Sequence, residues 1–456
     1  MGKEMNLDAS KTLSMRERIF YGCGGMGNAI VLAIVSTYLM FFYTDVIGLR
    51  AGIVGTILMG SKVLDGISDL VMGHIVDMTK SKWGKARCWI LWLCVPYAIS
   101  GVLLFMLSPA WPSVVQYIYV FITYNLVNTV MYTGICCPYN AMNALMTTNQ
   151  YERGMLGTTN VLGNAVGQAV VNTFILRLVS AFGNNQNAWI IASAVFGVIG
   201  IVMHVICFTQ TIERVKDDAA KSAEPTFIES VKSLFHNKYW LIVAAMATVL
   251  FFWNGIINTS AIYFAKSVLH DEQTVSWLTN SMVYAQIVAY CFAFIYIKKL
   301  GKGGCFKVGF ALASLSYVLQ IFAGTNYYAL IGCGVVRGLG IGMAASCLGG
   351  IISDTIEYGE WKTGVRCVGV GNAANTFAQK IGLGIGPALV GWLLEFAGYS
   401  SAAAQQSAVA LSAIHVCYTY IPLVCCVAIV ILAMNYKLDG QYDQIMKELN
   451  ERRRKR

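Results

Sequence analysis

Long apolar segments recur along the whole chain, and their length constrains the fold more than any other feature. About 20 apolar residues in a helix cross the roughly 30 Å hydrocarbon core of a bilayer. Only 12% of the 456 residues are charged and 57% are hydrophobic, which is unlike a soluble domain. The chain is therefore predicted to be an all-α integral membrane protein with twelve transmembrane helices. The predicted spans are 19–44, 51–77, 88–108, 113–141, 155–181, 188–211, 238–267, 274–297, 305–323, 327–353, 367–397 and 409–435.

The basic residues predict the orientation of these spans, because short cytoplasmic loops collect Lys and Arg. The two terminal segments and alternate connections hold 27 of the 33 basic residues. Both termini are therefore predicted to be cytoplasmic, in a multi-pass protein of the plasma membrane. The net charge of +10 follows from this topology and from attraction to anionic lipid. Because the basic residues are scattered over seven segments, they argue against nucleic-acid binding.

A polar interruption near 213–232 divides the predicted spans into six and six. Two six-span halves around a central site are a common transporter arrangement. The predicted parts are a six-helix bundle at 1–211, a cytoplasmic loop at 212–237, a second bundle at 238–436 and a basic tail at 437–456.

Three charged residues, Lys62, Asp65 and Asp69, lie inside the second apolar segment. Their spacing of three, four and seven residues places them on one helical face. Charges at membrane depth are costly and mark functional sites. Two carboxylates one turn apart repel unless a proton or cation neutralises one of them. The stripe therefore predicts a cation site with Lys62 as the resident counter-charge.

Sequence motifs around this stripe carry a family resemblance. They are Tyr43-Thr-Asp-Val-Ile-Gly-Leu49, Lys62-Val-Leu-Asp-Gly-Ile-Ser-Asp69, Gly73-His-Ile-Val-Asp77, Trp83-Gly-Lys85 and Ile352-Ser-Asp-Thr-Ile-Glu-Tyr-Gly-Glu-Trp-Lys362. Together they resemble the glycoside-pentoside-hexuronide:cation symporters of the major facilitator superfamily, which include the melibiose permease. The resemblance runs from Tyr21 to about Leu438 and implies two six-helix bundles that transport by alternating access.

The resemblance implies a cation site that includes Asp65, Asp69 and the hydroxyl of Thr133. Oxygen ligands suit hard cations. Ser68 is a further predicted cation ligand and stands where melibiose-type members have Asn, so that a shorter hydroxyl replaces an amide ligand. The coupling ion is predicted to be sodium or a proton, and the retained threonine favours sodium. No other cofactor and no bound metal are predicted.

The substrate side departs from the melibiose permease. Its two sugar-binding aspartates are replaced by Ala29 and Cys136, and an aromatic residue is replaced by Asn140. Lys380 occupies the position of the family's intramembrane lysine, and Arg337 lies inside the tenth span. These changes shift the cavity toward positive charge, which favours an acidic sugar such as a uronide. A neutral sugar remains the alternative, in which Lys380 serves only to neutralise Asp65 or Asp69.

Further polar residues in or beside the spans are candidates for two roles. Apolar platforms with a few polar groups bind small ligands. The cavity is therefore predicted to include Asn28, Tyr132, Trp253 and Asn254, although packing between helices remains the alternative for the asparagines. At the predicted cytoplasmic ends, a gate between the halves is predicted from Asp77, Arg87, Asp354, Glu357 and Arg366.

The predicted function is cation-coupled symport of a sugar or glycoside by a protein that acts as a monomer. The alternatives are a passive facilitator or channel, and a symporter of lipid-like amphiphiles on the same fold. No metal-ligand spacing, nucleophile elbow or protease-like pair of catalytic residues occurs in the sequence. An enzyme is therefore not expected.

Overall fold

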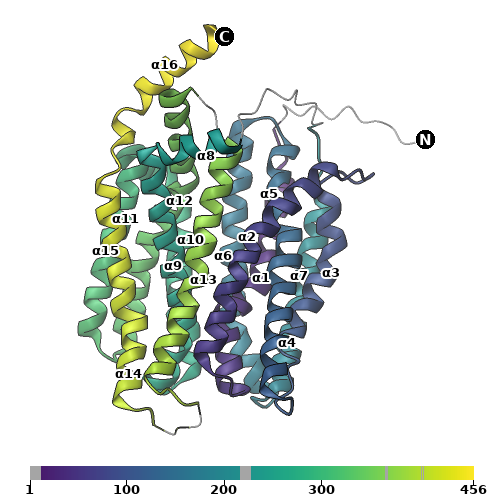
Figure 1. Ribbon diagram of the computed structural model, residues 1–456, viewed down its shortest axis with the longest axis vertical. Helices are drawn as coiled ribbons and strands as arrows, with labels where there is room; N and C mark the ends of the chain where they lie inside the picture. The colour runs from purple at the N-terminus through teal and green to yellow at the C-terminus, as the bar shows by residue number, and fades with distance from the viewer. Residues whose placement is uncertain (1–11, 216–226, 365–367, 402, 404, 456) are drawn as a thin grey trace. The chain divides into compact units, whose positions relative to one another are not determined.

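The computed structural model describes residues 12–215, 227–364, 368–401, 403 and 405–455, and these residues form helices joined by short connections (Figure 1). The chain divides into two compact units, Met1–Ala219 and Ala220–Arg456. The dividing point lies within the segment 212–237 that the sequence assigns to a central loop.

In the first unit, long helices pack side by side. Helix α1 packs against α6 and α7, α3 packs against α7, and α2 packs against α4 and α5. The elements are α1 (Met15–Phe41), the π-helix η1 (Phe42–Val46), α2 (Ala51–Met78), α3 (Arg87–Leu103), α4 (Ser113–Asn125), the π-helix η2 (Leu126–Tyr132), α5 (Thr133–Met146), α6 (Gln150–Ala181) and α7 (Gln186–Gln210).

In the second unit, α12 packs against α10 and α11, and α9 packs against α13. The short helix α8 lies across the ends of the long helices, at the end where α16 projects, and α14 lies at the opposite end (Figure 1). The elements are α8 (Phe227–Phe235), α9 (Lys238–Ser267), η3 (Glu272–Thr274), α10 (Val275–Cys291), α11 (Ala293–Ala323), α12 (Tyr327–Thr363), α13 (Val368–Phe396), α14 (Ala408–His415), the π-helix η4 (Val416–Tyr420), α15 (Ile421–Met434), η5 (Leu438–Gly440) and α16 (Tyr442–Lys455).

Ten helical segments in the described part of the chain are long and apolar enough to cross a bilayer. The other two predicted spans, 88–108 and 274–297, contain the shorter helices α3 and α10. The helix of the span 274–297 is irregular at Phe292 and then resumes, and the backbone leaves the helical conformation at Gly301, between the spans predicted at 274–297 and 305–323. Helix α11 is itself interrupted at Gly301, whose φ of 72° is accessible to glycine without steric cost.

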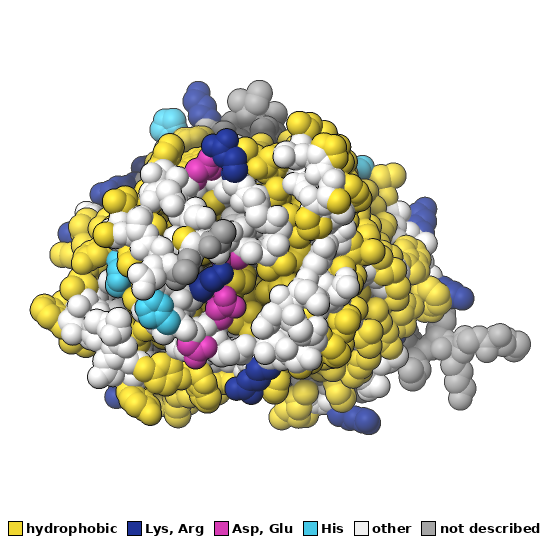
Figure 2. All heavy atoms as spheres, turned by 90° about the horizontal axis from the view of Figure 1, so that it is seen from below, with side chains coloured by type: hydrophobic (Ala, Val, Ile, Leu, Met, Phe, Trp, Pro, Cys, Tyr) yellow, Lys and Arg dark blue, Asp and Glu magenta, His cyan; other side chains and the backbone are white. Residues whose placement is uncertain are grey.

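Large apolar side chains lie on the surface of both units. Phe322, Tyr328 and Phe396 are 83%, 83% and 86% exposed. Figure 2 looks onto one end of the protein and shows hydrophobic side chains over much of the outer part of that face. Extended apolar surface of this kind is unfavourable in water and marks contact with a membrane or partner. It fits helices surrounded by lipid.

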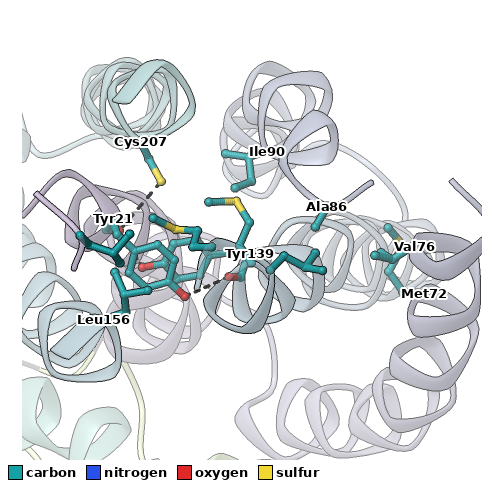
Figure 3. Packing of buried hydrophobic residues seen from close by; sticks show 12 residues of the cluster. Tyr21, Met72, Val76, Ala86, Ile90, Tyr139, Leu156 and Cys207 are labelled. Atoms are coloured by element: carbon teal, nitrogen blue, oxygen red, sulfur yellow. Dashed lines mark hydrogen bonds between the residues drawn. The ribbon is translucent and has the colours of Figure 1, made fainter. Parts of the chain in front are cut away.

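A cluster of buried residues closes one end of the first unit. It joins the first turns of α1, α3 and α6 to the last turns of α2, α5 and α7. At its centre the rings of Tyr21 and Tyr139 stack with their centroids 4.6 Å apart (Figure 3). Each hydroxyl donates to the other residue's backbone carbonyl, at 3.0 Å for Tyr21 and 2.8 Å for Tyr139. These reciprocal bonds satisfy both buried phenols and fix α1 against α5.

Glycines allow helices to approach closely in the second unit, for example where α11 crosses α12. A Cβ added at Gly340 would lie 2.2 Å from the carbonyl oxygen of Gly309, and one added at Gly309 would lie 2.3 Å from that of Gly340. Backbones of α11 and α12 therefore touch at this point, as small residues permit in membrane helices.

We expect Gly340→Ala to lower the unfolding temperature of the purified protein, because the new methyl group overlaps backbone atoms that cannot rotate away. Overpacking of this kind costs about 1–3 kcal/mol. Gly349→Ala is the matched control, since the same helix offers open space there. An equal loss in both variants would contradict close packing at Gly340. The measurement is thermal unfolding in detergent.

Candidate functional site

The charged stripe on α2 faces a hydroxyl from α5. The ammonium of Lys62 lies 3.2 Å from Asp65 Oδ2. The Thr133 hydroxyl oxygen lies 3.1 Å from Asp65 Oδ1 and 3.2 Å from Asp69 Oδ1. Lys62, Asp65 and Thr133 are 7%, 2% and 2% exposed. Lys62, Asp65, Asp69 and Thr133 therefore meet in one cluster, in which Asp69 is only partly buried.

The chemistry of this cluster suits a small cation or a proton. A threonine hydroxyl has one hydrogen to donate. The Thr133 hydroxyl lies within hydrogen-bond distance of both aspartates and, at 3.4 Å, of the Asn128 carbonyl. One hydrogen cannot bridge three acceptors at once, and the two carboxylates repel each other when both are ionised. A proton or an oxygen-seeking cation among these oxygens relieves that repulsion.

The π-helix η2 places Thr133 at this position. It spans Leu126–Tyr132 and ends directly before Thr133, the first residue of α5. A π segment inserts extra residues into a helix and turns the side chains that follow, and such segments are frequent at functional sites. Ser68, predicted as a cation ligand, donates its hydroxyl to the Thr129 carbonyl in η2. Ser68 is thus linked to the cluster through η2, which directly precedes Thr133.

The sequence interpretation missed a second polar layer beside the cluster. Asn125 donates to the Ser61 hydroxyl at 2.8 Å and accepts from Thr129 at 3.1 Å. The Lys62 ammonium also lies 5.8 Å from the centre of the Tyr124 ring, a cation–π distance. Asn125, Thr129 and Thr133 recur at intervals of four, so a polar face opposite α2 was available as a signal in the sequence.

Two of the residues predicted to bind the substrate, Asn28 and Tyr132, lie in the first unit, and Tyr97 lies beside both. The Asn28 amide oxygen lies 3.0 Å from His204 Nε2, and its carbonyl accepts from the Tyr97 hydroxyl at 3.3 Å. The Tyr97 and Tyr132 rings are 6.2 Å apart. The polar groups of Asn28 therefore bind to helices of its own unit.

Trp253 and Arg337 belong to a buried polar cluster in the second unit. The Trp253 indole donates to the Tyr317 hydroxyl at 2.8 Å, and the Arg337 guanidinium lies 4.6 Å from the centre of the Tyr317 ring. Arg337 also donates to Gln320 at 3.0 Å. The two residues are 0% and 2% exposed. Their partners come from α11, so both side chains join α9 and α12 to the interior of this unit.

A cavity of about 360 Å³ adjoins this cluster near the end of α11. Gln320 and Thr419 line it together with Phe264, Ser412, His415 and Tyr420. Gln320 donates to Thr419 at 2.9 Å and accepts from Arg337. None of the residues predicted to bind the substrate lines the cavity. Asn254 accepts from Asn258 at 3.0 Å along α9, and Lys380 is partly buried on α13.

The predicted gate residues that the structure describes each have a partner in their own unit. Asp77 lies 3.5 Å from Lys85, and Arg87 donates to the Phe208 carbonyl at 2.7 Å. Both oxygens of Asp354 accept from Lys302 at 2.7 Å.

Glu357 accepts from the Tyr442 hydroxyl on α16. Burial and this carboxylate raise the pKa of the Tyr442 phenol, so it stays a donor at neutral pH. Helix α16, which occupies part of the predicted tail, is also held by a 2.8 Å hydrogen bond from Trp361 to Glu448. Arg366 lies outside the described residues.

Comparison with known proteins gives relatives that match nearly the whole chain. An isoprimeverose transporter of Lactiplantibacillus pentosus is 31% identical over 445 residues, which cover 96% of this chain and 91% of that protein. A putative glycoside/cation symporter, YagG of Escherichia coli strain K12, is 30% identical over 446 residues, covering 97% of this chain and 96% of that protein.

The fold is also that of known transporters. The chain is similar to a bacterial homologue of the human lysosomal transporter Spinster, with a TM-score of 0.61, 14% identity and coverage of 96% of this chain and 97% of that one. The family described as MFS/sugar transport protein matches residues 20–440. The protein is a multi-pass membrane transporter and not an enzyme, and the plasma membrane is the typical location of this family. The chain thus belongs to the glycoside-pentoside-hexuronide:cation symporters of the major facilitator superfamily.

Proposed function

We propose that this protein couples the inward movement of a sodium ion or a proton to that of a sugar or glycoside. The observation that carries the proposal is the meeting of Asp65, Asp69 and Thr133 oxygens beside Lys62 at membrane depth. A buried pair of carboxylates is costly to keep unless it binds a cation. Sodium is the preferred ion because the threonine offers a third oxygen, whereas a proton needs only a carboxylate of suitable pKa.

The proposed cycle uses alternating access between two six-helix bundles with twelve spans and cytoplasmic termini. Cation binding stabilises the state that binds sugar, and by linkage the sugar raises cation affinity by the same factor. We propose that Asp77, Arg87, Asp354, Glu357 and Arg366 form a cytoplasmic gate whose charge pairs change partners during the cycle. The pairs of Asp354 with Lys302 and Glu357 with Tyr442 are the ones that would exchange.

For the substrate, we propose a sugar whose charged group contacts Lys380. Similarity to an isoprimeverose transporter supports a sugar. The loss of carboxylates at Ala29 and Cys136 makes a uronide or another acidic glycoside the first candidate. Arg337 is held by Gln320 and Tyr317 in the interior of its unit. Asn28, Tyr132, Trp253 and Asn254 are proposed to shape the cavity.

We expect proteoliposomes containing the protein to accumulate a transported sugar above its external concentration only when an ion gradient is imposed. Radiolabelled uptake is measured with an inward sodium gradient, an inward proton gradient, both, or neither. Accumulation under one gradient alone identifies the ion. Uptake that only equilibrates under every gradient would instead indicate a passive facilitator and overturn the coupling.

The same assay tests the substrate class with a labelled glucuronide and its neutral glucoside. Preferential uptake of the glucuronide supports recognition of an acidic sugar. Preference for the glucoside would contradict it and leave Lys380 as a neutralising charge. Uptake of a lysolipid in place of either sugar would favour the alternative of an amphiphile symporter.

A further inference from the structure

An open groove lies where α8, α9 and α15 meet at one end of the second unit. Its volume is about 400 Å³, within the range of about 300–1,000 Å³ typical of small-ligand sites. Phe235, Leu241, Ile242 and Leu432 give it an apolar wall, and His236, Lys238 and Asn435 give it a polar rim. Apolar and polar groups are thus separated within one groove.

The groove lies at the boundary between the apolar core of a bilayer and water. Lys238 is the first residue of the membrane-crossing helix α9, and Asn435 directly follows the last residue of α15. Its apolar wall continues along both helices toward the middle of the membrane. Phe235 is 66% exposed and Leu241 is 38% exposed, so both can contact lipid.

The charge of the rim is positive. No carboxylate is among the residues that line the groove, and within the described part of the chain Lys238 has neither an ion pair nor a hydrogen bond from its side chain. A second cation stands close by, since Lys362 donates to the His236 carbonyl at 3.3 Å. One nitrogen of the His236 ring donates to the Lys232 carbonyl at 2.8 Å, which holds the ring at the rim.

Helix α8 holds this corner rigidly. Apolar residues of α8 recur at positions 227, 228, 231, 234 and 235, the pattern of a helix that lies in a membrane surface. Asn237 joins α8 to α9, accepts from the Trp240 amide at 3.0 Å and donates to the Thr355 carbonyl of α12 at 2.7 Å. These bonds therefore hold the backbone at the rim residues His236 and Lys238, on either side of Asn237.

We propose that this groove binds an anionic phospholipid of the cytoplasmic leaflet, with the phosphate at Lys238 and the upper acyl chains along Leu241, Ile242 and Leu432. Basic pockets between helices on the cytoplasmic side are suited to anionic headgroups. The placement in that leaflet rests on the proposed orientation. A bound lipid would hold α8 against α15, at the end of the unit where α12 carries Asp354 and Glu357.

The test is native mass spectrometry of the full-length protein in a mild detergent with equal amounts of phosphatidylglycerol and phosphatidylcholine. We expect the wild type to retain phosphatidylglycerol in preference. Lys238→Gln should bind it about fivefold more weakly, which is the effect of about 1 kcal/mol for one lysine at a membrane surface. Lys238→Arg should retain it. Lys447→Gln removes the same charge from exposed α16, outside the groove, and should bind like the wild type.

Three results of this comparison would overturn the proposal, and a fourth comes from competition with inorganic phosphate. They are equal retention of both lipids by the wild type, unchanged binding by Lys238→Gln, and an equal loss in Lys447→Gln. The wild-type comparison needs no variant, so the proposal remains testable if Lys238→Gln does not fold. Inorganic phosphate that competes away the lipid at millimolar concentration would show a free-ion site and also contradict it. No substrate or coupling ion is present, so the outcome is independent of the transport proposal.

Discussion

Asp65→Asn and Asp69→Asn are each expected to abolish accumulation of the sugar while leaving the protein in the membrane. Either change removes one of the two carboxylates that approach the Thr133 hydroxyl. An amide cannot neutralise a cation, and loss of a charged partner costs about 1.5–3 kcal/mol, or at least about tenfold in ion affinity. Because ion and sugar binding are linked, sugar affinity in the presence of the ion falls as well. Uptake into proteoliposomes under the driving ion gradient measures the effect.

Two controls separate loss of coupling from loss of folding. Exchange of labelled for unlabelled sugar without a gradient should persist in both variants, because exchange needs alternating access but no net ion movement. Glu272→Gln removes a carboxylate that pairs with Lys266 at 3.6 Å near the surface, and should accumulate sugar normally. Full accumulation by both aspartate variants would contradict the assigned cation site.

Thr133 gives a graded version of the same test. Thr133→Ser keeps the hydroxyl that approaches both carboxylates, whereas Thr133→Val keeps the shape and removes it. If sodium is the coupling ion, only the valine variant should need more sodium for half-maximal uptake. A proton-coupled protein would respond weakly to either change, because the carboxylates alone hold the proton.

The local part of this site could be predicted from the sequence. A helix repeats every 3.6 residues, so the spacing of Lys62, Asp65 and Asp69 fixes them on one face whatever surrounds the helix. Their burial also follows from the sequence, since charges in a membrane helix avoid lipid. The contact with Thr133 joins residues 64 and 68 positions apart, and periodicity within one helix carries no information about it. The family resemblance supplied that residue.

Other features depend on tertiary packing that no local pattern records. The π-helix η2 lies against α2, since its Thr129 carbonyl accepts from Ser68 and Asn125, the residue before η2, donates to Ser61. The sequence predicts Arg337 and Trp253 as substrate-site residues but gives no sign that Tyr317 contacts both of them. Helix α16 did carry a signal, since Ile445 and Leu449 are four residues apart and both are buried. The high charge of the segment concealed it.

Lys62→Met is expected to destabilise the protein strongly when no coupling ion is present, and added ion should largely restore stability. Lys62 and Asp65 form an ion pair that is almost fully buried. Removing one partner of such a pair leaves an uncompensated charge and costs about 3–5 kcal/mol. The ion binds among the same carboxylates, so it can replace the missing ammonium. The measurement is the unfolding temperature in detergent with and without the ion.

Lys266→Met is the matched control for Lys62→Met, because it removes a lysine from a partly exposed pair with Glu272 that is worth at most about 1 kcal/mol. The double variant Lys62→Met/Asp65→Asn should be more stable than Lys62→Met alone, since it removes the buried charge along with its partner. Its stability should also respond less to the ion. A loss in Lys62→Met no larger than in Lys266→Met would mean that Lys62 is not the counter-charge of the carboxylates. A loss that neither the ion nor the second substitution relieves would give Lys62 a packing role instead, since only an electrostatic role predicts both forms of rescue.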